Sequence, residues 1–242
     1  MELKKRFDIS NYLVVGPENT KGRPVHHIIK EAVGAGFTCV QIRSKLASAK
    51  DMIDLTRSAS QVIAESDRPD KVALLVDDRL DVVLAARKYG IKVDGIHVGQ
   101  SDIPVDVCRE YLGEDSIIGV SARTIDMLDY VTTIDAGLID YLGVGPLRET
   151  RTKPDCGMGP DGKVRTMDLD EISALAQMSP VPVVVGGGVK LSDVPGLART
   201  GVDGFFVVSA VTEADDPGLE AKKLVEAWRS NKINRSRIPR LA

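Results

Sequence analysis

The chain has 242 residues and a formal net charge of −3, with 43% hydrophobic but only 4% aromatic residues. This length predicts one large or two small domains, with a core of aliphatic side chains typical of a parallel sheet buried on both faces. The small net charge gives no global argument for binding nucleic acid or a membrane, and we expect neither as a partner.

Short runs rich in β-branched residues alternate along the chain with segments compatible with helices. This alternation is typical of β–α–β units and a parallel sheet. The predicted strands are Tyr12–Gly16, Thr38–Arg43, Val72–Asp77, Gly95–Val98, Ile117–Ser121, Tyr141–Gly145, Val181–Gly186 and Gly204–Ser209. Apolar spacing predicts helices over Val25–Ala35, over Leu80–Lys88, from Pro104 through Leu112, and over Glu213–Arg229. Glycines placed to end helices are Gly36, Gly90, Gly113 and Gly137.

Eight such units in one chain predict a single closed (β/α)8 barrel. The alternative, an open doubly wound sheet, usually has fewer strands and a GxGxxG turn, whereas residues 16–24 read GPENTKGRP. No linker interrupts the pattern, so we expect residues 1–228 to form the barrel. Residues 229–242 carry five basic residues and no acidic one. We expect a flexible solvated tail there rather than an anion-binding arm.

The cysteines and the N-terminus indicate a cytoplasmic protein. Cys39, Cys108 and Cys156 form no CxxC pair, which argues against a disulfide framework and a zinc site. Cys39 lies in a predicted strand and is expected to pack in the core. The charged first residues lead into no apolar segment typical of a signal peptide, and the longest apolar runs have strand length.

Polar residues follow the predicted strands, at the end where barrels of this class carry their active sites. Three cations there could hold a polyanion, because guanidinium and ammonium groups both bind phosphate. They are Arg43, Lys45 and Lys153. Asp78 and Asp102 are carboxylates of the kind that holds Mg²⁺ together with water and substrate phosphates. The glycines of Gly186–Gly188 offer backbone N–H groups of the kind with which barrels commonly bind a phosphate.

Each of these features also has a purely structural interpretation. Asp77 and Asp78 could simply cap the following helix, which we weigh as an equal alternative. His97 is interpreted as a packed polar group rather than a catalyst, because no nucleophile is evident beside it. The functional interpretation is favoured because cations, carboxylates and glycines all fall on the same predicted rim.

The motifs and their order resemble those of thiamine-phosphate synthases. That family has VQLRxK on its second strand, where residues 40–45 here read VQIRSK. It has GQxD after a G-[VI]-H-[LV] strand, where residues 95–102 read GIHVGQSD. It has TxTK following GxGP, where residues 143–146 read GVGP and residues 150–153 read TRTK. The resemblance extends in order from Val40 to Val211.

The resemblance implies a transferase with Mg²⁺ as its cofactor. It would condense 4-amino-2-methyl-5-pyrimidinylmethyl diphosphate with 4-methyl-5-(2-phosphooxyethyl)thiazole, giving thiamine phosphate and pyrophosphate. A pyrimidine-methyl cation as the intermediate needs no protein nucleophile, so the protein would neutralise the leaving group and position the thiazole nitrogen. The partners would be these small-molecule substrates, and a homo-oligomer is left open.

The resemblance also implies a role for each matched residue. Asp78 and Asp102 would bind Mg²⁺ on the pyrophosphate. The pyrophosphate itself would be held by Arg43, Lys45, Ser121 and Lys153, of which Arg43, Ser121 and Lys153 form the catalytic set. Gln41 would contact the pyrimidine. The surroundings of the thiazole phosphate would be Thr150, Thr152, Gly188 and Ser209.

Two departures from the family pattern stand out. Asp77 occupies the position of the family's usual Asn, and an ionised carboxylate cannot donate a hydrogen bond to pyrophosphate as an amide does. Asp77 remains in the substrate-binding set, where it would either assist the metal site or carry a proton. The segment Pro154–Thr166 is long and glycine-rich, and our hypothesis is that it closes over the pyrophosphate.

Three rival functions share the barrel. A thiazole tautomerase carries a His near the position of Ser121 and lacks the full pyrophosphate-binding set. A non-catalytic sensor of a phosphorylated ligand would not need paired carboxylates. An epimerase would need an acid/base pair facing a sugar, and no such pair is evident. The sequence therefore favours the synthase.

Overall fold

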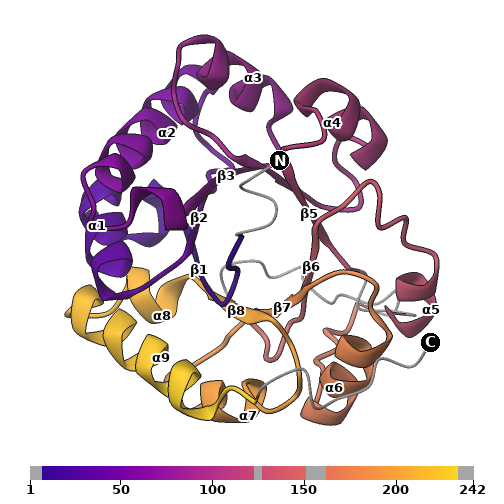
Figure 1. The fold of residues 1–242 in the computed structure, drawn as a ribbon. Coiled ribbons are helices and arrows are strands. Elements are labelled where there is room, and N and C mark those ends of the chain that lie inside the picture. The colour runs from indigo at the N-terminus through magenta and orange to yellow at the C-terminus, as the bar shows by residue number, and fades with distance from the viewer. Residues whose placement is uncertain (1–6, 123–126, 151–161, 234–242) are drawn as a thin grey trace.

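The computed structural model describes residues 7–122, 127–150 and 162–233, which form a closed barrel of eight parallel strands inside a ring of helices (Figure 1). The strands are β1 Asn11–Val15, β2 Cys39–Ile42, β3 Ala73–Asp77, β4 Gly95–Val98, β5 Ile117–Ser121, β6 Tyr141–Val144, β7 Val183–Val185 and β8 Gly204–Val207. They follow chain order around the barrel, and β8 pairs with β1. The predicted (β/α)8 barrel is confirmed, with every strand within two residues of its predicted ends.

The α-helices are α1 Val25–Ala35, α2 Ala49–Ala64, α3 Leu80–Lys88, α4 Val105–Leu112, α5 Met127–Thr132, α6 Leu169–Met178, α7 Val194–Leu197, α8 Ser209–Thr212 and α9 Pro217–Asn231. Short 3₁₀ turns lie at Pro17–Asn19, Pro69–Lys71 and Leu191–Asp193. Within the described ranges, no helix combines the length and the apolar character needed to cross a membrane.

The helix predicted over Glu213–Arg229 is wrong at its start. The side chain of Asp216 accepts a hydrogen bond from the Leu219 backbone N–H at 2.9 Å, and Pro217 occupies the first helical position. With this cap, helix α9 begins at Pro217, and residues Ser209–Thr212 form the separate short helix α8. Gly137 was also misplaced as a helix end, because α5 already ends at Thr132. Helix α9 runs to Asn231, and residues 234–242 of the predicted basic tail lie outside the described residues.

Alternating strand residues divide the core into two layers. Outward-facing residues such as Leu13, Val40 and Leu74 pack against the helices, while Tyr12, Cys39 and Leu75 fill the barrel interior. This division follows from the two-residue period of a strand. Cys39 is fully buried in the interior cluster, which confirms the prediction that it packs in the core.

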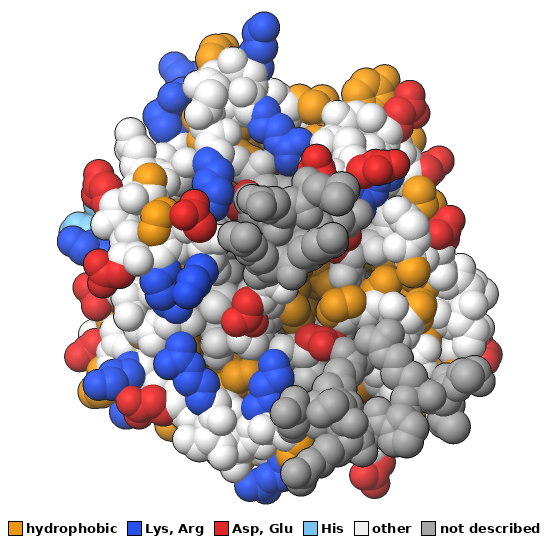
Figure 2. Space-filling model, in the orientation of Figure 1, with side chains coloured by type: hydrophobic (Ala, Val, Ile, Leu, Met, Phe, Trp, Pro, Cys, Tyr) orange, Lys and Arg blue, Asp and Glu red, His pale blue; other side chains and the backbone are white. Residues whose placement is uncertain are grey.

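The same alternation places the polar residues. Gln41, Asp77, His97 and Ser121 continue the inward-facing rows of β2 to β5 at the C-terminal ends of these strands. On the face of the molecule shown in Figure 2, acidic and basic side chains lie interspersed among the described residues. This mixture agrees with the small net charge of −3.

Candidate active site

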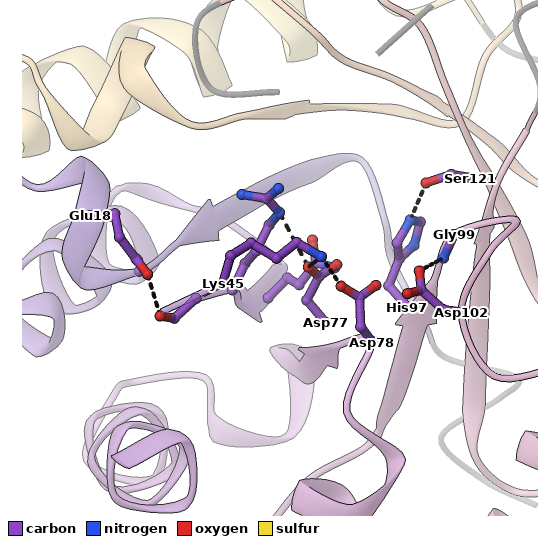
Figure 3. Close-up of polar contacts among 12 residues, drawn as sticks. Glu18, Lys45, Asp77, Asp78, His97, Gly99, Asp102 and Ser121 are labelled. Atoms are coloured by element: carbon purple, nitrogen blue, oxygen red, sulfur yellow. Dashed lines mark hydrogen bonds and ion pairs between the residues drawn. The ribbon is translucent and has the colours of Figure 1, made fainter. Parts of the chain in front are cut away.

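Predicted site residues from four neighbouring strands meet at the C-terminal ends of β2, β3, β4 and β5. In Figure 3, Lys45 reaches toward Asp77 and Asp78, and Asp102 and His97 lie on the far side of Asp78. Ser121 closes the group from the end of β5. The expectation that these residues share one rim therefore agrees with their places in the structure.

Asp77 contacts three other predicted site residues at the C-terminal ends of β2 and β3. Its Oδ1 accepts a hydrogen bond from Gln41 Nε2 at 2.8 Å, and its Oδ2 lies 3.2 Å from Arg43 Nε and 3.5 Å from Lys45 Nζ. The carboxyl is only 9% exposed. Burial, followed by the nearby charge of Asp78, raises the pKa of Asp77 to about 7. Asp77 therefore orients the amide of Gln41 and holds both cations in place.

Asp78 and Asp102 are the other two carboxyl groups at the ends of β3 and β4. Their side chains hydrogen-bond to each other, Asp78 also pairs with Lys45, and Asp102 accepts from the Gly99 N–H at 2.8 Å. Burial alone would raise the pKa of Asp78, but the hydrogen bonds from Lys45 and Asp102 outweigh it, so this pKa is lowered. Burial and the bond to Asp78 raise the pKa of Asp102. The two carboxyls therefore lie close enough to shift each other's pKa in opposite directions.

The backbone of Asp78 lies in the left-handed region, with a φ of +60° that residues other than glycine seldom adopt. Its N–H donates to the His97 carbonyl at 2.8 Å, which ties the turn after β3 to β4. Such conformations cluster at functional sites, where the surrounding structure holds them in place. Here the turn directs the Asp78 side chain toward Lys45 and Asp102.

The alternative interpretation of the Asp77–Asp78 pair, as a helix cap, is not supported. Helix α3 is preceded by Arg79 as its N-cap residue, and no side chain caps it. Arg79 instead forms two bonds to Asp81, at 2.8 and 2.5 Å. The carboxyls of Asp77 and Asp78 are directed to the rim.

His97 has a hydroxyl beside it, contrary to the expectation from the sequence. Its Nε2 lies 3.0 Å from Ser121 Oγ, and its Nδ1 lies 2.8 Å from the Tyr141 hydroxyl. In the triad of a serine hydrolase, a carboxylate holds that second nitrogen. The pair of His97 and Ser121 is therefore a hydrogen-bonded unit and not the core of such a triad.

The other half of the rim follows β6, β7 and β8. Gly187 and Gly188 have φ values of +77° and +76°, which a residue with a side chain would adopt only under strain. The chain after β6 packs on this turn: Leu147 N–H donates to the Gly187 carbonyl at 3.0 Å, and Arg148 Nη1 donates to that of Gly188 at 3.2 Å. Ser209 lies exposed just after β8.

Several predicted site residues stay untested. Thr150 is half-buried in the segment after β6. Thr152 and Lys153 lie outside the described residues, as do residues 154–161 of the segment for which we hypothesised closure.

Two residues of the site were not predicted from the sequence. Tyr12 and Tyr141 lie inside the barrel with their hydroxyls 2.9 Å apart, and Tyr141 reaches His97. The alternation of inward- and outward-facing residues along the strands could have indicated Tyr141, because His97 pairs with Gly119 and Gly119 pairs with Tyr141 across neighbouring strands. The three positions therefore share the inward-facing side of the sheet.

Comparison with known proteins gives one consistent result. The family model described as thiamine monophosphate synthase matches residues 11–211. A thiamine-phosphate synthase from Corynebacterium efficiens is 36% identical over 221 residues, covering 91% of this chain and 95% of that protein. One from Chloroflexus aurantiacus is 37% identical over 231 residues, covering 93% and 94%.

Solved structures agree with the sequence relatives. The thiamine phosphate pyrophosphorylase from Pyrococcus furiosus superimposes with a TM-score of 0.75 at 26% identity, covering 93% of this chain and 98% of that one. A 3-hexulose-6-phosphate synthase gives a TM-score of 0.62 at 16% identity, a likeness that concerns the fold alone.

Proposed function

The chain belongs to the thiamine monophosphate synthase family, and from this premise we propose how its barrel rim makes thiamine phosphate. It condenses 4-amino-2-methyl-5-pyrimidinylmethyl diphosphate with 4-methyl-5-(2-phosphooxyethyl)thiazole and releases pyrophosphate. One observation carries the proposal: Arg43 and Lys45 converge with the carboxyl groups of Asp77 and Asp78 at the ends of neighbouring strands. A site that must hold a diphosphate and neutralise it as it leaves needs this combination.

The half of the rim from β2 to β5 is proposed to bind the diphosphate. Arg43 and Lys45 supply positive charge, and Ser121 adds a hydroxyl from the end of β5. Gln41 contacts the pyrimidine, and its amide is oriented because Nε2 donates to Asp77 at 2.8 Å. Lys153 is assigned to the same phosphate group from its motif.

The residues present fit Mg²⁺, judged by the chemistry of the donor set. Asp78 and Asp102 bring carboxyl oxygens within hydrogen-bonding reach of each other, so one cation between them can contact both. Among the described residues, no group of three or more His, Cys, Asp and Glu side chains could hold a metal. Two carboxylates suffice for Mg²⁺, which keeps water and phosphate oxygens as further ligands. When bound, Mg²⁺ would supply charge neutralisation of the departing pyrophosphate.

The half of the rim from β6 to β8 is proposed to bind the thiazole phosphate. The half-buried Gly187–Gly188 turn would offer backbone N–H groups to the phosphate, and Ser209 adds an exposed hydroxyl on the adjacent strand end. Thr150 and Thr152 complete this set. Holding each substrate by its own phosphate places the thiazole nitrogen against the pyrimidine-methyl carbon, which is catalysis by positioning.

The direct test of this function is product formation. The purified protein should convert the two substrates and Mg²⁺ into thiamine phosphate and an equal amount of pyrophosphate, measured by chromatography and by a pyrophosphate assay. Omitting either substrate should abolish both signals. A folded protein that forms no product would refute the proposal, and conversion of the thiazole phosphate alone to an isomer would favour the tautomerase.

We predict that Asp77→Asn tightens pyrophosphate binding several-fold. The substitution removes a buried negative charge that competes for Arg43 and Lys45, and it adds an amide that can donate to the anion. Isothermal titration with pyrophosphate and Mg²⁺ measures the effect. The matched control is Asp70→Asn, which changes an exposed carboxylate just before the other end of β3. Weaker binding in Asp77→Asn than in this control would contradict the account.

A further inference from the structure

A chain of hydrogen bonds runs from the barrel interior to the rim and ends at Ser121. The Tyr12 and Tyr141 hydroxyls lie 2.9 Å apart, Tyr141 Oη lies 2.8 Å from His97 Nδ1, and His97 Nε2 lies 3.0 Å from Ser121 Oγ. Tyr12 and Tyr141 are buried, whereas Ser121 is partly exposed. The chain of hydrogen bonds thus has a closed end at the buried Tyr12 and an open end at the partly exposed Ser121.

The sheet is shaped to accommodate this chain. A Cβ atom on Gly119 would lie 2.0 Å from Cζ of the Tyr141 ring, so only glycine at this position of β5 lets the ring lie across the strand. Tyr12 and Tyr141 meet edge to face with centroids 6.0 Å apart. At the open end, Gln100 Nε2 donates to the Ser121 carbonyl at 2.7 Å and fixes the backbone there.

The closed end determines which way the hydrogens point. If Ser121 donated to His97, then His97 would donate from Nδ1 to Tyr141, and Tyr141 would donate to Tyr12. The hydrogen of the Tyr12 hydroxyl would then be left buried without an acceptor among the described residues, which is costly. In the opposite direction each of these hydrogens has an acceptor: Tyr12 donates to Tyr141, Tyr141 to His97 Nδ1, and His97 Nε2 to Ser121.

We infer that Tyr141 and His97 are positioning residues that present the Ser121 hydroxyl as a hydrogen-bond donor to a phosphate oxygen at the rim. In this direction the Ser121 oxygen accepts from His97, and its own hydrogen is free to point outward to an anion. The inference rests on the proposed function for the identity of that anion, the diphosphate. A hydroxyl locked as a donor favours an anionic oxygen over a donor group of a competing ligand.

Burial supports this assignment. It is the largest cause that raises the pKa of both tyrosines well above the usual value, so the two hydroxyls keep their protons. Neither tyrosine can then act as an acceptor-only phenolate that would reverse the direction of the chain.

The first test needs no change inside the chain of hydrogen bonds. The protein has three histidines, and His26 and His27 are both exposed on α1, so replacing both with Asn leaves His97 as the sole histidine. A ¹⁵N spectrum of this protein labelled at histidine should show the neutral ring with its hydrogen on Nε2. A hydrogen on Nδ1 would overturn the inference, whatever the enzyme's activity.

The second test uses binding of pyrophosphate. Ser121→Ala and Tyr141→Phe should each weaken it about tenfold, the loss of one hydrogen bond to a charged group. The double variant should be no weaker than either single variant, because both changes remove the same oriented donor. Losses that multiply in the double variant would overturn the inference, since they would mean that Tyr141 acts independently of Ser121.

Tyr12→Phe provides the matched spectroscopic comparison. It removes a hydroxyl from the same buried pair, but Tyr141 then becomes the closed end and must still donate to His97. The Nε2–H form of His97 should persist in Tyr12→Phe and be lost or mixed in Tyr141→Phe. The same spectrum in both variants would contradict the inference. Because these readouts require no turnover, failure to make thiamine phosphate would refute the proposed function separately.

Discussion

Replacing Asp102 with alanine is expected to lower kcat about 100- to 1,000-fold, the cost of weakening the site for the Mg²⁺ that would neutralise the departing pyrophosphate. Asp102 shares a hydrogen bond with Asp78, so its loss leaves the proposed Mg²⁺ site with one carboxylate. Stability should hardly change, because the side chain is at the rim and its other bond is to the Gly99 N–H. One such bond is worth about 1 kcal/mol, or roughly 2–4 °C in Tm.

The measurement is a Mg²⁺ titration of the initial rate together with thermal unfolding. Asp102→Ala should need more Mg²⁺ and should reach a lower plateau. Asp106→Ala is the matched control, since it removes an exposed carboxylate four residues further along the chain. If Asp102→Ala lost many degrees of Tm along with its activity, Asp102 would be a structural residue.

Arg43→Ala should lower kcat/KM for the diphosphate about 100- to 1,000-fold. Arg43 lies largely buried, with Nε 3.2 Å from Asp77 Oδ2, so the substitution removes a phosphate-binding fork and a partner of a buried carboxylate. Arg43→Lys should recover only part of the loss, because an ammonium group cannot reproduce the planar pair of donors. Steady-state kinetics with the thiazole phosphate held saturating measures the effect.

The control for Arg43 is Arg79→Ala, which removes a more exposed guanidinium paired with Asp81 just after the neighbouring strand. It should change kcat/KM by no more than about twofold, because surface ion pairs contribute little. Adding Asp77→Asn to Arg43→Ala should recover stability, since no unpaired buried carboxylate remains. An Arg43→Ala enzyme as active as Arg79→Ala would remove Arg43 from the catalytic set.

The barrel could be predicted from the sequence because its signal is repeated. Each strand is a short apolar run and each following segment has helical spacing, so eight local patterns agree on one architecture. The error at α9 arose from following the apolar pattern back to Glu213. The cap formed by Asp216 and Pro217 was visible in the sequence and has the stronger physical basis for a helix start.

The composition of the rim could also be anticipated, but its internal contacts could not. Strand ends place Arg43, Asp77 and Ser121 on one rim whatever their pairing. The left-handed backbone of Asp78 depends on the hydrogen bond to the His97 carbonyl, which is a tertiary contact. The approach of the Asp78 and Asp102 side chains likewise depends on how two separate turns meet.

The central claim is that one rim carries two separate anion sites, and two KM values test it most directly. Lys45→Ala should raise KM for the pyrimidine diphosphate about tenfold and leave KM for the thiazole phosphate unchanged. Ser209→Ala should do the reverse, because Ser209 follows β8 on the other half of the rim. If both variants raised both KM values alike, the division of the rim into a diphosphate half and a thiazole phosphate half would be wrong.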